Sequence, residues 1–325
     1  MNRKALALLL SGALCLTLAA GCSSDGGGSA AKDSTPPGTA AQQTPSAAPS
    51  PSGDPAPVET PDAAPGDTLE SSGTLGDYGV EIKDFALAKD YTGASAIVIT
   101  YTFTNNSEEA AAAMVALSDT AYQNGLQLDI AVIADSSVCD PQSAMLEVKT
   151  GGSIDVQKAY VLVSETAPVS IEIGELFSFS GDKLGKTFEI SEGGVTELAT
   201  IDVPADAVTG SVGDYEVSII SCTAVKDYQG ADAVVITYGF TNHSDKTANF
   251  MTAVRDIAYQ DSVQLTSAVI GDTDVHDSTD VMRNVQPGAS VIVTSAYTTT
   301  STSPIEVEVG ALFGGTSITR TFTLE

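Results

Sequence analysis

The sequence predicts an all-β protein built from two tandem antiparallel immunoglobulin-like β-sandwich domains, which follow a signal peptide and a disordered linker. Two observations predict this class. First, "KDYTGASAIVITYTFTNNS" at 89–107 returns as "KDYQGADAVVITYGFTNHS" at 226–244, with fourteen of nineteen positions identical. Second, apolar residues in both copies alternate with the two-residue period of a β-strand. We therefore expect one β-rich unit that occurs twice.

The duplication extends well beyond these nineteen residues. At an offset of 137 residues, the chain aligns without a gap from Gly73 to Ser164 in the first copy and from Gly210 to Ser301 in the second. "AYQNGLQL" at 121–128, for example, meets "AYQDSVQL" at 258–265. Solenoid repeats have periods of roughly 20–50 residues, so a period this long indicates two self-contained domains.

Local patterns predict the strands and turns of each copy. In "AIVITYTF", Ile97, Ile99, Tyr101 and Phe103 share one strand face. Asn124-Gly125 is a strong signal for a two-residue hairpin, and Asp261-Ser262 is a weaker one. The alanine-rich stretch 107–122 has a copy without that richness, so we predict no long helix there. Six to eight short strands per unit favour a sandwich, with a small barrel as the alternative.

The chain divides into five segments on this reading. We expect a signal peptide at 1–21, followed by a lipidated cysteine and a disordered tether at 22–67. The first sandwich then occupies 68–191, an inter-domain linker 192–209 and the second sandwich 210–325. The tether is rich in Pro, Ala, Ser and Thr, a composition that buries too little apolar surface to offset the entropy of ordering the chain. It would hold the domains away from a surface.

The first residues predict where the protein is located in the cell. "MNRK" is a basic start, and an apolar stretch follows that ends in "LAAGC". This ending resembles the lipobox of bacterial lipoproteins. The resemblance implies that Cys22 becomes the first mature residue and carries a diacylglycerol, with the protein on the extracytoplasmic face of the cell membrane. The alternative is an ordinary secretory signal that is cut nearby.

The repeated "KDYxGxxAxVITYxFTN" and "AYQxxxQL" motifs also carry a resemblance. They are similar to an uncharacterised immunoglobulin-like domain family of Firmicutes lipoproteins, which is distantly similar to the secreted mycobacterial immunoprotective antigen fold. The resemblance covers both copies. It implies the fold and the location, and it assigns no catalytic or ligand-binding residue.

The charge of the chain limits its partners. Against 14 Lys and Arg stand 42 Asp and Glu, for a formal net charge of −28. Such a charge repels nucleic-acid phosphates, so we expect no nucleic-acid partner. The partners expected are the membrane, through the N-terminal lipid, and a protein or cell-wall ligand.

One acidic loop is a candidate metal site. In "GDTDVHDSTD" at 271–280, Asp272, Asp274 and Asp277 lie close together, and His276 stands among them. Closely spaced carboxylates can collect oxygen ligands around Ca²⁺, but the spacing differs from that of an EF-hand. The alternative is an exposed polar loop, and we predict no cofactor and no response to calcium beyond ionic screening.

Two further residue types offer weaker candidates. Tyr122 and Tyr259 precede the hairpin turns and could form a binding platform, although such tyrosines are more often half-buried structural residues. Cys139 and Cys222 occupy non-equivalent positions, so we expect no disulfide between them and expect Cys222 to be a small buried residue. No catalytic motif and no catalytic residue is identified.

Two function classes follow. The first is a non-enzymatic binding or adhesion module that a lipid displays on the bacterial envelope, where two linked domains raise avidity. The alternative is an envelope enzyme or accessory subunit with an unrecognised carboxylate site. An enzyme of this kind would need a carboxylate or tyrosine constellation, and none is evident in the sequence.

Replacement of Cys22 tests the predicted anchor. Cys22→Ala removes the sulfur that would carry the lipid, so we expect the protein to leave the membrane fraction or to be mislocalised. Fractionation with a lipid label measures this. Unchanged membrane retention of the variant, together with no lipid label on the wild-type protein, would contradict the prediction.

Overall fold

The computed structural model of the protein describes residues 69–177, 181–312 and 314–324. The described residues of both repeats fall in one compact unit. The signal peptide, Cys22 and the whole of the tether lie outside the described residues, so the expectations about them stay predictions. None of the helices in the described ranges has the length and apolar character needed to span a membrane.

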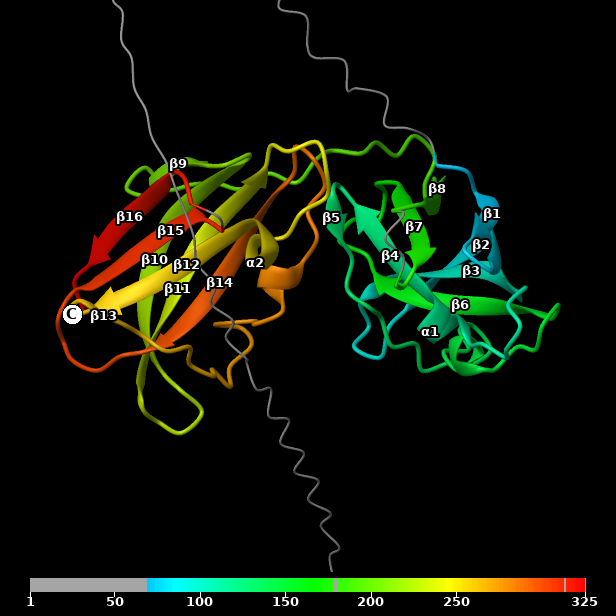
Figure 1. The fold of residues 1–325 in the computed structure, drawn as a ribbon, viewed down its shortest axis with the longest axis horizontal. Helices are drawn as coiled ribbons and strands as arrows, with labels where there is room; N and C mark the ends of the chain where they lie inside the picture. Colours follow the sequence, from blue (N-terminus) through cyan, green and yellow to red (C-terminus); the bar gives the residue numbers. More distant parts are fainter. Residues whose placement is uncertain (1–68, 178–180, 313, 325) are drawn as a thin grey trace, which may run out of the picture. The chain divides into compact units, whose positions relative to one another are not determined.

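The first repeat consists of two four-stranded antiparallel sheets (Figure 1). The first sheet has the order β1-β2-β3-β6, with β1 (Ser72–Leu75), β2 (Tyr78–Lys89), β3 (Ser95–Asn105) and β6 (Ser153–Val161). The second sheet has the order β5-β4-β7-β8, with β4 (Leu117–Gln123), β5 (Leu126–Gln127), β7 (Val169–Glu175) and β8 (Lys183–Phe188).

The second repeat has the same topology (Figure 1). One sheet comprises β9 (Val208–Val212), β10 (Tyr215–Lys226), β11 (Asp232–Asn242) and β14 (Ser290–Thr298). The other comprises β12 (Val254–Gln260), β13 (Val263–Gln264), β15 (Ile305–Ala311) and β16 (Ser317–Phe322). Even an irregularity is copied, because the register shift between Ile82 and Asp84 recurs between Ile219 and Ser221.

This topology confirms the predicted all-β class with two repeated domains. Each repeat has two separate sheets, so it is a sandwich and the small barrel is excluded. The inward faces of the two sheets form the core: Tyr101 and Phe103 of β3 are fully buried in one cluster with Ile171 and Ile173 of β7. The predicted strand face therefore lies where its alternation placed it.

The segment that precedes β4 contains only one helical turn. It is α1 (Ala113–Ala116) in the first repeat and α2 (Phe250–Ala253) in the second, which agrees with the expectation of no long helix. A short 3₁₀ turn follows in each repeat, η1 (Ser143–Met145) and η2 (Asp280–Met282). The predicted hairpins are present, with positive φ at Asn124, Gly125, Asp261 and Ser262.

A buried amide closes one end of each sandwich. The Asn242 side chain, fully buried at the end of β11, donates to the carbonyls of Lys246 and Val285 and accepts from the amide and hydroxyl of Ser244. Asn105 repeats the arrangement in the first repeat. The amide satisfies polar groups that burial would otherwise leave unpaired.

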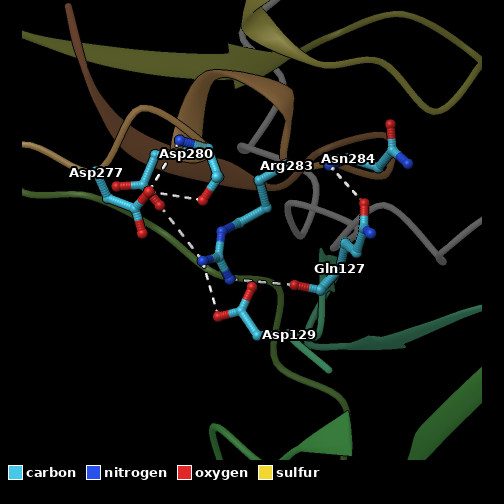
Figure 2. Close-up of polar contacts among 7 residues, drawn as sticks. Gln127, Asp129, Asp277, Asp280, Arg283 and Asn284 are labelled. Carbon is cyan, nitrogen blue, oxygen red and sulfur yellow. Dashed lines mark hydrogen bonds and ion pairs between the residues drawn. The ribbon is translucent and has the colours of Figure 1, made fainter. Parts of the chain in front are cut away.

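Backbone and side-chain contacts join residues of the two repeats (Figure 2). Leu126 and Val285 form an antiparallel bridge, in which the Gln127 amide donates to the Asn284 carbonyl at 2.9 Å. The Arg283 guanidinium donates to the carbonyl of Gln127 and pairs with Asp129 at 3.0 Å. In the first repeat, Leu146 stands at the position equivalent to Arg283, so only the second repeat supplies a guanidinium at this position.

Removal of the buried amide tests its structural role. Asn242→Ala leaves the Val285 carbonyl buried without its donor, so we expect the free energy of unfolding to fall by about 2–3 kcal/mol. Urea denaturation of the full-length protein measures the loss. His243→Ala, at the neighbouring exposed position, is the matched control, and an equal loss in both variants would contradict the assignment.

Candidate functional site

The acidic loop uses its carboxylates to cap its own turns. Asp272 accepts the backbone amide of Asp274, and Asp277 accepts both the amide and the hydroxyl of Thr279. The hydrogen bond from the Thr279 hydroxyl is the main reason that the pKa of Asp277 is lowered. Such caps are what short polar side chains commonly do in turns. Asp135 does the same in the first repeat, with Ser137.

The structure does not gather the predicted metal candidates into one ligand set. Within the described residues, no group of three or more His, Cys, Asp or Glu side chains is placed to hold a metal ion. Asp280 of the same loop turns instead to Arg283, at 3.3 Å (Figure 2). The absence of calcium binding stays a prediction.

His276 makes its side-chain contact with β14 and not with the exposed aspartates of the loop. Its ring is buried, and Nδ1 hydrogen-bonds the hydroxyl of Thr294 on β14 at 2.8 Å. Burial lowers the pKa of His276 from its usual 6.5, against the opposing influence of Asp277 and Asp280. The imidazole is therefore neutral at pH 7.

The two candidate tyrosines differ in exposure. Tyr122 is buried, at 3% exposure, and burial, with the Glu172 carboxylate as a smaller cause, raises its pKa. Tyr259 is half-buried at the equivalent position. The structure thus does not give the two repeats equivalent aromatic surfaces, and a binding role for either ring stays a prediction.

A polar constellation that the sequence analysis missed lies between the sheets of the first repeat. Asp119 of β4 accepts the hydroxyl of Tyr160 from β6 at 2.6 Å and the hydroxyl of Tyr101 from β3 at 3.2 Å. The ammonium of Lys158, also on β6, lies 3.2 Å from the same carboxylate. The Asp119 side chain is only 9% exposed, so two hydroxyls and one ammonium replace the water it gives up.

The second repeat contains the same tyrosines and carboxylate. Asp256 of β12 accepts the hydroxyl of Tyr297 from β14 at 2.6 Å. The hydroxyl of Tyr238 from β11 lies near both groups but makes no hydrogen bond of good geometry, and it is the one buried side-chain polar atom of the described chain without a partner. Ser295 stands where the first repeat has Lys158, so the lysine that pairs with the carboxylate in the first repeat has no counterpart at this position.

Burial and the carboxylate together hold the tyrosines in their neutral form. Desolvation is the main cause that raises the pKa of Tyr101, Tyr160, Tyr238 and Tyr297, and the nearby aspartate adds to it. At neutral pH these hydroxyls are protonated donors. They are poorly suited to general acid–base catalysis, because an effective catalytic group has a pKa near the working pH.

A cleft opens above the carboxylate in each repeat, between the edge strand of one sheet and the loop that follows the hairpin. In the first repeat it has a volume of about 220 Å³, and Asp119, Lys158, Tyr160 and Cys139 are among its lining residues. In the second repeat it has a volume of about 650 Å³, and Asp256, Ser295, Tyr297 and His276 line it at the equivalent positions.

The two clefts differ in chemistry although they share their position. The first has apolar walls, with Ile130, Pro141 and Ala144, and its Lys158 faces Asp119. The second has Ser267 and Ser278 where the first has Ile130 and Pro141, together with Thr266 and Thr294. Duplication therefore preserved the carboxylate and its tyrosines while the surroundings diverged.

Both cysteines are free thiols, but the fully buried one is Cys139 and not Cys222 as expected. Cys139, on the wall of the first cleft, is the fully buried thiol, at 3% exposure. Cys222 is half-buried and packs against the second core, so its prediction as a fully buried residue is corrected. Cys222 pairs across the sheet with the buried Ile236, so it faces the core, and burial raises its pKa to about 11.

Comparison with known proteins identifies a family. The model described as "Domain of unknown function (DUF5067)" matches residues 59–175 and 205–311, together more than half of the chain and one match per repeat. The predicted resemblance to tandem copies of an uncharacterised domain family is thereby confirmed. No curated protein matches the chain.

Among solved structures, one described as "a putative lipoprotein from Staphylococcus aureus subsp. aureus NCTC 8325" is similar to part of the chain. Its sequence identity is 11%, and the match covers 38% of this chain and 92% of the other, with a TM-score of 0.31.

Removal of the cleft carboxylate in each repeat tests the difference between the repeats. Asp119→Asn leaves the Lys158 ammonium, 27% exposed, without its counter-charge, so we expect a loss of about 2 kcal/mol in the free energy of unfolding. Asp256→Asn leaves no ammonium without its counter-charge, so the free energy of unfolding should fall by less. Urea denaturation of the full-length variants compares the two losses, and a larger loss for Asp256→Asn would contradict this account.

Proposed function

Because the chain belongs to the family described as Domain of unknown function (DUF5067), which assigns it no activity, we propose its function from the clefts. We propose that the protein is a non-enzymatic binding module of the bacterial envelope. A lipid on Cys22 anchors it, the tether at 22–67 extends it from the membrane, and the two clefts bind its ligand. The ligand is a protein or a cell-wall component.

The observation that carries this proposal is the pair of equivalent clefts, each over a carboxylate that accepts a tyrosine hydroxyl. A concave surface with a few convergent polar groups is the usual form of a ligand site. Two such clefts on one chain allow two contacts with a repetitive ligand, and this raises the avidity without any new chemistry. Cell-wall polymers are repetitive ligands of this kind.

The alternative, an envelope enzyme or accessory subunit, receives less support. The Tyr–Asp–Tyr constellation is the shared carboxylate site that an enzyme would need. Its tyrosines, however, are held protonated by burial, and in the first repeat its carboxylate is paired with Lys158. In the first repeat, groups arranged in this way stabilise one another and are poorly suited to accept a proton near neutral pH.

Blocking both clefts tests the proposal. Ile130→Trp and Ser267→Trp place an indole at equivalent exposed positions on the rims of the two clefts. We expect the full-length double variant to lose most of its retention on isolated cell-wall fractions and on envelope proteins. Co-sedimentation of labelled protein with these fractions measures the retention.

A matched control has two tryptophans away from both clefts. Tyr91 and Tyr228 occupy equivalent exposed positions, and the Tyr91→Trp, Tyr228→Trp variant should be retained like the wild type. Equal retention of all three proteins, with folding verified by circular dichroism, would mean that the clefts are not the binding sites.

A further inference from the structure

The cleft of the second repeat lacks a positive charge that the first repeat supplies itself. We infer that this cleft binds a small ligand through a primary aliphatic ammonium group, which takes the place that the lysine ammonium occupies in the first repeat. The inference rests on the proposed function, since it names the ligand chemistry of one of the two clefts.

The first repeat indicates which group the carboxylate accepts. The Lys158 side chain reaches from β6 into the cleft and holds its ammonium 3.2 Å from Asp119. A lysine side chain ends in a four-carbon chain with an ammonium, so the first repeat contains the equivalent of a bound alkylammonium ion that is covalently attached. An ion pair of this kind is strengthened where the surrounding protein excludes water.

The second repeat keeps the receptor and lacks the occupant. Asp256 and Tyr297 match Asp119 and Tyr160, and their hydrogen bond has the same length, 2.6 Å. Ser295 replaces the lysine, and the cleft is larger, about 650 Å³ against about 220 Å³. The shorter side chain leaves space in front of the carboxylate.

The lining of this cleft suits an ammonium ion. Asp256 is the one residue among its described lining with a formal charge at neutral pH, because burial keeps His276 neutral. An ammonium has three donors, and the hydroxyl of Ser295, next to Tyr297, is an acceptor on the same wall as the carboxylate. The Tyr238 hydroxyl, buried without a partner, is a further polar group near Asp256.

The charges around the cleft favour a cation as well. Asp277 and Asp280 both act on His276 from the neighbouring loop, and Arg283 is engaged with Asp280 and Asp129. The chain as a whole has a formal net charge of −28. A negative potential of this kind raises the local concentration of cationic ligands and disfavours anionic ones.

Titration with butylammonium, which reproduces the end of a lysine side chain, tests the inference. Isothermal titration calorimetry of the full-length wild type should give saturable binding of one butylammonium ion per chain. Butan-1-ol has the same chain without the charge, and tetramethylammonium has the charge without N–H donors. We expect both to bind at least about tenfold more weakly.

Four variants locate the site. Ser295→Lys supplies the second repeat with its own ammonium, and Asp256→Asn removes the carboxylate, so both should weaken butylammonium binding at least about tenfold. Lys158→Ser empties the first cleft and should add a second binding site, which butylammonium fills with recovery of lost thermal stability. Ser317→Lys, at an exposed position on β16, adds the same charge elsewhere and should bind like the wild type.

The outcomes separate this inference from the proposed function. The inference is overturned if the wild type shows no saturable binding, or if correctly folded Ser295→Lys and Asp256→Asn proteins bind butylammonium as the wild type does. If butylammonium does not bind while retention on cell-wall fractions still depends on the two clefts, the clefts bind a ligand of different chemistry. If butylammonium does not bind and retention does not depend on the clefts, the proposed function is overturned as well.

Discussion

In each repeat, a carboxylate on one sheet accepts a hydrogen bond from a tyrosine hydroxyl of the opposite sheet, and the architecture of the cleft depends on this interaction. The Asp119 carboxylate on β4 accepts hydrogen bonds from the hydroxyls of Tyr101 on β3 and Tyr160 on β6. These bonds join the two sheets beside the cleft. A charge in this position is costly unless it is hydrogen-bonded, so the hydroxyls fix both the carboxylate and the adjacent strand edge.

Duplication makes the role of individual residues visible within one chain. The core, the buried Asn105 and Asn242, and the tyrosine–aspartate pairs are common to both repeats, as expected for groups that the fold requires. Several of the residues that differ line the cleft, where Lys158 of the first repeat aligns with Ser295 of the second. A shared framework with divergent walls fits two binding sites of different selectivity, and it accounts for the divergence without any change of fold.

Much of the fold could be predicted because its signals are local. Alternation placed the strand with Tyr101, and Asn124-Gly125 placed a hairpin, since both depend on residues that are neighbours in the sequence. The site could not be predicted in the same way, because Asp119 and Tyr160 are 41 residues apart and meet only across the two sheets. The available signal was an aspartate preserved in both copies on the inward face of a strand, between Leu117 and Ala121. The acidic loop at 271–280 attracted attention by its composition, yet its carboxylates serve mainly to cap turns.

The central claim is that the second cleft is an open receptor whose counterpart in the first repeat is filled by Lys158. A crystal structure of the protein soaked with butylammonium tests it most directly, because it shows both clefts at once. We predict electron density for the ion in the second cleft, with its nitrogen about 3 Å from an Asp256 carboxylate oxygen, and an unchanged Lys158–Asp119 pair in the first. An empty second cleft at saturating butylammonium, or an Asp256 side chain turned away from it, would contradict the account.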